Sequence, residues 1–124
     1  MFGVEISSPN IFVKSKNHSY TYAVDGSLPN PLEATYAALA GCAGVYALKV
    51  CKKLAKSPEG IKITCRPVNR ADNPLTLSKW TTVIEFPEGW SEEEQNLVLA
   101  EVQKCAVKEL ISTGSQIQFV TEKA

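Results

Sequence analysis

Cysteines are the residues of this chain whose type and placement could do chemistry. Cys42 lies inside an apolar, helix-like run and is flanked by Gly41 and Gly44, whereas Cys105 opens the run CAVKELISTG. A glycine costs ~1 kcal/mol in a helix interior relative to alanine, so the two glycines favour close approach of another backbone or room beside the sulfur, although simple packing would also explain them. Two thiols on separate helical segments can react with each other if the fold brings them together. Thiol redox chemistry is therefore our first hypothesis.

The thiolate is the reactive form of cysteine, so the pKa decides what such a pair can do. An unperturbed thiol with a pKa of ~8.5 is only about 3% ionised at pH 7, and lowering the pKa to ~6 takes about 3.4 kcal/mol. If a helix ends and another begins at Cys105, the N–H groups of the new helix would stabilise its thiolate. Without that break, Cys105 is simply a helix residue. A thiolate that attacks a peroxide becomes a sulfenic acid, which condenses with a second thiol to a disulfide.

The other two cysteines are predicted to be packing residues. Free cysteine is among the most buried residue types; Cys65 alternates with isoleucines, and Cys51 lies between lysines near a helix end. The spacing of the four cysteines matches no zinc site, and His18 is the only histidine. We therefore expect neither a bound metal nor a cofactor.

Composition fits one globular domain covering residues 1–124, with 44% apolar and 21% charged residues. The formal net charge is zero, which leaves no electrostatic footprint for nucleic acid or for an anionic membrane. The opening MFGVEISSPN lacks the basic segment and apolar core of a signal peptide, so we expect a cytoplasmic protein. A fifteen-residue apolar stretch (34–48) is shorter than the about 20 residues that span a membrane, which favours a buried helix.

The helices and strands that must position the cysteines are predicted from turn and capping residues and from the periodicity of apolar residues. Residues 2–24 predict short strands separated by turns. Asn30 and Pro31 predict a helix start, with Glu33 at the third helical position, and the helix is expected to reach about Lys56. Because its centre is apolar on every side, we expect this helix to be buried all round.

The second half of the chain predicts two strands, a helical region and a last strand. GIKITCRPV and KWTTVIEF alternate in polarity, and Ser91 with Glu94 forms a capping box that starts a helix. The inner face of that helix is expected to hold Leu97, Val98 and Val102, and also Cys105 if the helix continues that far. Residues 115–122 predict a final strand. This order indicates an α+β fold with antiparallel sheet. Six short strands hardly cover such a helix, so we infer that a second subunit covers the rest.

Three stretches together resemble the OsmC/Ohr family, which is named after osmotically induced protein C and organic hydroperoxide resistance protein. They are NPLEATYAALAGC, GIKITCRPV and CAVKELISTGSQIQFV, and the likeness follows nearly the whole chain in order. The resemblance implies an intertwined homodimer with central long helices and sites at the subunit interface. It also implies a thiol-dependent peroxidase that acts on organic hydroperoxides and less efficiently on hydrogen peroxide, in defence against oxidative stress. Cys42 matches the peroxidatic cysteine and Cys105 the resolving one, and a thiol reductant would restore both.

The chain departs from the family pattern close to the site. Peroxidase members carry an arginine in the N-terminal strands and a glutamate that holds it, but the arginines here are Arg66 and Arg70. Glu33 lies one residue closer to the cysteine than the family's glutamate, and it is also the expected capping-box residue behind Asn30. Ala106 stands where the family commonly has proline. His18 or Lys14 could supply the missing polarity, although strand or surface roles are more expected for both.

Three other hypotheses are therefore alternatives to a peroxidase function. One is a non-catalytic binding module whose interface pocket, lined by Leu39, Tyr46, Trp80 and Phe86, holds an apolar small molecule. The missing N-terminal arginine favours this module. Another is a redox sensor that forms the disulfide without turning over a substrate. The last is a structural role in which all four cysteines are merely buried.

Overall fold

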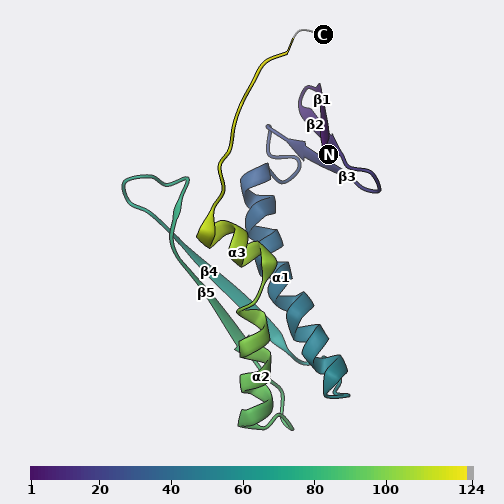
Figure 1. Cartoon of the computed structure of the whole chain (residues 1–124), viewed down its shortest axis with the longest axis vertical. Coiled ribbons are helices and arrows are strands. Elements are labelled where there is room, and N and C mark those ends of the chain that lie inside the picture. The colour runs from purple at the N-terminus through teal and green to yellow at the C-terminus, as the bar shows by residue number, and fades with distance from the viewer. Residues whose placement is uncertain (123–124) are drawn as a thin grey trace. The chain divides into compact units, whose positions relative to one another are not determined.

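A computed structural model describes residues 1–122 of the chain, and its elements are of the α+β class (Figure 1). The chain divides into two compact units, the first running from Met1 to Ala38 and the second beginning at Leu39. Helix α1 (Pro31–Lys53) contributes residues to both. The expectation of a single domain over 1–124 stays a prediction. The α+β class predicted from the sequence is confirmed by two antiparallel sheets and three helices among the described residues.

The first unit contains a three-stranded antiparallel sheet, as residues 2–24 predicted. Its strands are β1 (Gly3–Ser7), β2 (Asn10–Lys14) and β3 (Ser19–Ala23), hydrogen-bonded in that order. Strand β1 is exposed along its whole length, including the apolar side chains of Val4 and Ile6. This outer edge therefore offers unpaired backbone groups and apolar side chains to solvent.

Helix α1 begins as predicted but ends earlier than predicted. The backbone N–H of Glu33 donates to Asn30 Oδ1 at 2.9 Å, which confirms Asn30 as the cap. At the other end the helix stops at Lys53 because Ala55 adopts a left-handed φ of 52°. The N–H of Lys56 then donates to the carbonyl of Cys51 (2.9 Å), and that of Ala55 to Lys52 (3.2 Å). These two bonds make a Schellman motif, so Lys56 lies outside the helix.

The expectation that α1 is buried on every side depends on a second subunit and stays a prediction, because the described chain by itself buries one face of the helix. Its buried residues fall on one face, at Leu39, Ala43, Ala47, Val50 and Cys51. On another face Val45 keeps 53% of its surface exposed. The other elements of the described chain pack against one stripe of the helix, whereas its apolar residues lie on every side.

Length and composition alone would also let α1 cross a membrane. Its best 18-residue window has a mean hydropathy of 1.3, and 28% of that window is buried. The core helix of a globular domain passes the same test, so this finding is weak evidence for a membrane span.

In the second unit, β4 (Lys62–Asn69) and β5 (Leu77–Glu85) form an antiparallel hairpin. The alternation predicted for β4 is confirmed, because Ile63 and Cys65 are half-buried while Lys62, Thr64 and Arg66 are exposed. Cys65 lies directly opposite Thr82 in the register. The hairpin therefore turns one face towards the helices of this unit.

Helix α2 (Glu92–Val102) starts at the predicted capping box, in which Glu94 N–H donates to Ser91 Oγ and Ser91 N–H to Glu94 Oε1. Val98 is fully buried and forms the core with Ala47 and Val50 of α1. Six half-buried residues surround this core: Leu54, Ile63, Ile84, Phe86, Trp90 and Val102. The prediction that Val98 and Val102 lie on the inner face of α2 is confirmed. The same prediction for Leu97 is wrong, because that residue is 46% exposed. Leu97 precedes Val98 by one position, which turns it about 100° away from the core.

Helix α3 (Ala106–Thr113) ends at Gly114, which has a φ of 74°. The final strand predicted for 115–122 is wrong for the described chain, because these residues form no strand. The alternating apolar side chains that suggested it are exposed, with Phe119 at 92%. A strand needs a neighbour to take up its N–H and C=O groups, and no strand among residues 1–122 is hydrogen-bonded to this segment.

Candidate functional site

Cys42 and Cys105 are joined by a disulfide. Their Cα atoms are 6.1 Å apart across 63 positions of sequence, and both residues belong to the second unit. The sequence predicted a thiol pair from residues on two separate helical segments, and the fold brings those two residues together. The remaining cysteines, Cys51 and Cys65, are free.

Cys105 lies at the helix break that the sequence allowed but did not prove. Helix α2 ends at Val102, and Cys105 is the N-cap of α3. Its sulfur accepts a hydrogen bond from the backbone N–H of Lys108 at 3.4 Å, and the residue is only 3% exposed. The free N–H groups of a helix start carry partial positive charge, so this position favours a thiolate at Cys105.

Cys42 has a different environment. It lies in the middle of α1 and is half-buried. A side chain added at Gly41 or Gly44 would meet no atom within 4 Å, so within the described chain the glycines leave open space and no backbone approaches them closely. Of the two explanations for these glycines, room beside the helix is the one that the chain itself supports.

None of the charged residues discussed as partners of Cys42 is hydrogen-bonded to it in the described chain. Arg70 pairs with Asp72 at 2.7 Å in the β4–β5 turn, and Arg66 is exposed on the outward face of β4. Among residues 1–122, no hydrogen bond or ion pair joins a lysine or arginine side chain to Cys42. Glu33, which belongs to the first unit, is exposed, and its supporting role stays a prediction.

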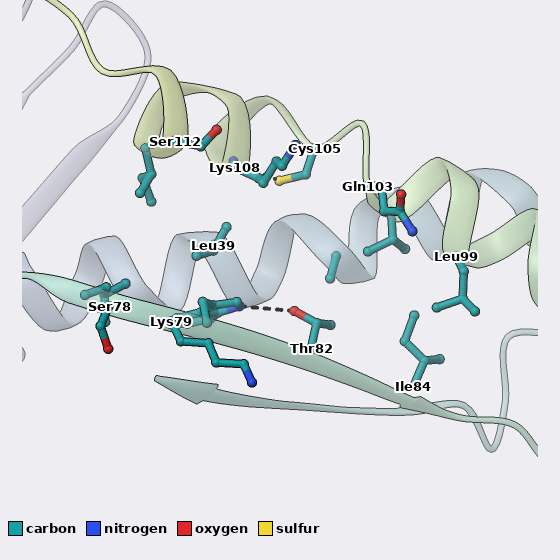
Figure 2. Close-up of a pocket in the computed structure, with 15 residues that line it drawn as sticks. Leu39, Ser78, Lys79, Thr82, Ile84, Leu99, Gln103, Cys105, Lys108 and Ser112 are labelled. Atoms are coloured by element: carbon teal, nitrogen blue, oxygen red, sulfur yellow. Dashed lines mark hydrogen bonds between the residues drawn. The ribbon is translucent and has the colours of Figure 1, made fainter. Parts of the chain in front are cut away.

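A cavity of about 540 Å³ lies in the second unit, with Cys105 on its wall. Figure 2 shows Cys105, the N-cap of α3, and Lys108 of α3 on one side and Thr82 and Ile84 of β5 on the other. Most of the lining is apolar, and its polar groups come from Ser78, Lys79, Thr82, Gln103, Lys108 and Ser112. The indole N–H of Trp80 donates to Thr82 Oγ1 at 3.1 Å, which fixes one polar point of the wall.

Of the four residues predicted to line a pocket, two lie in the cavity wall and two lie elsewhere. Leu39 and Trp80 line the cavity, but Phe86 and Tyr46 are not among its lining residues. Phe86 packs against Trp90 in a tilted arrangement, with ring centroids 5.1 Å apart, and Tyr46 lies under the Lys49 ammonium at 4.6 Å. Sequence reasoning missed Lys108, although its place three residues after a capping Cys105 is the position whose N–H a cap receives.

The two free cysteines fit the packing roles predicted for them. Cys51 is almost fully buried on α1. Cys65 is half-buried, with its sulfur 3.8 Å from Thr82 Oγ1. Among residues 1–122 no group of three histidine, cysteine or acidic side chains gathers as metal ligands do.

Comparison with known proteins identifies the family. The OsmC-like protein family matches residues 24–120, which is most of the chain, and the chain therefore belongs to that family. No curated protein matches it.

Two solved structures share the fold. A hypothetical protein from Aquifex aeolicus VF5 has a TM-score of 0.69 at 20% identity, and the alignment covers 93% of this chain and 88% of that one. A second structure, described only as structural genomics, has a TM-score of 0.73 at 12% identity, covering 91% of this chain and 89% of that one. Identities this low establish a common fold and say nothing about the reaction.

Proposed function

We propose that this protein is a thiol-dependent peroxidase that reduces organic hydroperoxides through a Cys42–Cys105 thiol–disulfide cycle. The observation that carries the proposal is the disulfide between these residues, of which Cys105 lines a mainly apolar cavity. A peroxidase of this kind passes through a disulfide in every turnover. Membership of the OsmC-like family supports the same chemistry.

The cycle balances with one hydroperoxide and two thiol equivalents. The Cys42 thiolate attacks the outer oxygen of ROOH, the O–O bond breaks, and the alkoxide takes a proton to leave as ROH. Cys42 becomes a sulfenic acid. Cys105 then attacks that sulfur, the S–O bond breaks, water leaves, and the disulfide forms. An external dithiol, or two monothiols, reduces the disulfide and is itself oxidised.

The cavity supports an organic rather than an inorganic peroxide. Its volume of about 540 Å³ lies within the range of small-molecule sites, and its lining is mainly apolar. An apolar R group would gain free energy by leaving water for this space, whereas hydrogen peroxide has no such group. The α1 side of the cavity is formed by Leu39 and by Ala43, which is the next residue after Cys42, and Cys105 also lines it, so an R group bound there would hold its O–O bond near the Cys42–Cys105 pair.

The working form in this proposal is a homodimer in the cytoplasm. Val45 and Leu48 of α1 and Leu110 and Ile111 of α3 are exposed apolar side chains, which a second copy would cover. A second copy could also bring to Cys42 the charged group that one chain does not. In a reducing compartment a protein disulfide is usually transient and catalytic, which suits the proposed cycle.

The test follows thiol loss after the reduced protein meets excess cumene hydroperoxide. Wild type should lose two thiols within minutes, and Cys42→Ser should lose none at this rate. Cys105→Ser should stop at a sulfenic or overoxidised Cys42. Cys65→Ser is the matched control and should behave as wild type, because that thiol is outside the pair. Thiols that stay unchanged in the wild type would refute the peroxidase.

A non-catalytic binding module is the second candidate, and one observation favours it. Cys42 has no lysine or arginine side chain hydrogen-bonded to it within the described chain, while the cavity is formed without help from its sulfur. Titration of wild type and Cys42→Ser with an apolar fluorescent ligand separates the two functions. Equal affinity together with no peroxide consumption supports the module. A redox sensor would instead form the disulfide with peroxide but consume only one equivalent, even with reductant present.

A further inference from the structure

The two sulfurs of the disulfide have unequal surroundings, and this bears on how the bond is reduced. Cys105 is 3% exposed and its sulfur accepts the N–H of Lys108 at the start of α3, an eight-residue helix. Cys42 is half-buried and lies in a helix interior, where the backbone N–H groups are already used within the helix. The Cys105 sulfur therefore has a backbone N–H donor that would stabilise a thiolate there, and Cys42 is the more exposed residue of the two.

The charged side chains next to Cys105 do not explain this stabilisation. Lys104 pairs with Glu101 at 2.9 Å and Lys108 with Glu109 at 3.0 Å, so each neighbouring ammonium has a carboxylate beside it. The backbone N–H groups that open α3 remain, and Ala106 contributes one of them because it is not proline. The stabilising group is thus the helix terminus itself.

We infer that the external reductant attacks Cys42 and that Cys105 is the leaving group. A reductant thiolate bonds to the Cys42 sulfur, the S–S bond breaks, and its electron pair goes to Cys105, which leaves as a thiolate held by the Lys108 N–H. A second thiol then attacks the reductant's sulfur in the mixed disulfide, frees Cys42 and completes the two-electron transfer. Disulfide exchange proceeds faster through the leaving group of lower pKa, and access decides which sulfur is reached.

This inference extends the proposed function to its reductive half, yet its test needs no peroxide. Cys51→Ser/Cys65→Ser protein is oxidised with diamide, mixed with excess glutathione, quenched in acid, alkylated and mapped by peptide mass spectrometry. We expect the glutathione adduct on Cys42 and the alkyl group on Cys105, in an excess of about tenfold over the reverse. An adduct on Cys105, or an even division, would overturn the inference. Failure of the peroxidase assay would leave this result untouched.

A matched pair of variants tests the role of the helix start. Ala106 is exposed at the first position of α3, so Ala106→Lys and Ala106→Glu change charge there without changing packing. A charge at a helix terminus changes the rate by roughly two- to fivefold. Ala106→Lys should speed reduction of the disulfide by glutathione, and Ala106→Glu should slow it by a similar factor. Equal rates in both variants would contradict a leaving Cys105 thiolate, and thermal unfolding checks that both proteins are folded.

Discussion

Two regions of the second unit are held together by different means. Around Val98, helices α1 and α2 and the β4–β5 hairpin bury a core, and the Lys56 ammonium binds both Glu94 (2.9 Å) and the carbonyl of Gly89 (2.6 Å). Helix α3 has no buried residue, and Leu110 is 62% exposed. A covalent bond from its N-cap, Cys105, ties it to α1. Burial thus stabilises the first region permanently, whereas the second depends on the redox state of one bond.

Reduction of the disulfide should show this difference with the largest effect. A loop closed over 63 positions contributes about 4 kcal/mol in the chain-entropy view, and that free energy of unfolding is lost when the bond is reduced. Denaturant unfolding with and without reductant measures the total. Hydrogen exchange should place the added opening in α3, while amides around Val98 stay protected. Equal loss of protection in both regions would contradict the comparison.

Truncation of the core should destabilise the other region. Val98→Ala removes two methyl groups from a fully buried site and is expected to cost about 2 kcal/mol of unfolding free energy in both redox states. Leu97→Ala is the matched control on the same helix, and at 46% exposure it should change stability by less than about 0.5 kcal/mol. Similar losses in the two variants would show that Val98 is not the centre of this core.

The sequence predicted best where a local rule settles the structure. Asn30 and the Ser91–Glu94 box mark helix starts through bonds to N–H groups three residues on, and both are confirmed. The break at Cys105 was visible only as an alternative, because Ala106 continues a helix as readily as it starts one. The thiol pair was predicted from the types and surroundings of Cys42 and Cys105, but the cavity required the tertiary fold.

The expectations that one chain does not meet share one physical cause, which is that they depend on contacts supplied from outside the described chain. Residues 115–122 alternate like a strand, yet no neighbouring strand completes them in the described chain. Val45 is apolar as a core residue would be, yet nothing in that chain buries it. The early end of α1 is different in kind, because Ala55 adopts a left-handed conformation that alanine seldom takes and no pattern announces it.

A substitution at Ala55 should change the stability of the packed region by less than Val98→Ala does, and in the opposite direction. Ala55→Gly removes the steric cost of a φ of 52° and should raise the free energy of unfolding by about 0.5–1 kcal/mol. Ala100→Gly, at an exposed position inside α2, should instead lower it by about 1 kcal/mol. Chemical denaturation of the two variants compares them directly, and a loss in both would remove the Schellman motif as the reason why α1 ends at Lys53.

The smallest predicted effect is a pH dependence of stability that arises at Glu94, the partner of Lys56. The Ser91 backbone N–H, and then Lys56, lower the pKa of Glu94 below its ordinary value of 4.5. Because the folded state holds the carboxylate, its contribution to stability is present above about pH 4.5 and is lost as pH falls through the lowered value. Glu94→Gln should therefore narrow the stability gap between pH 7 and pH 3. An unchanged gap would show that this carboxylate does not link folding to protonation.

The disulfide also closes residues 42–105 into a covalent ring that encloses β4, β5 and α2. A peptide bond broken inside a ring does not divide the chain. While the bond is intact, a cut in the exposed β4–β5 turn would leave the two fragments tethered at Cys42 and Cys105 with the core around Val98 still assembled. After reduction the same cut would release them. Oxidation thus makes the molecule tolerant of backbone damage, and reduction exposes it to turnover.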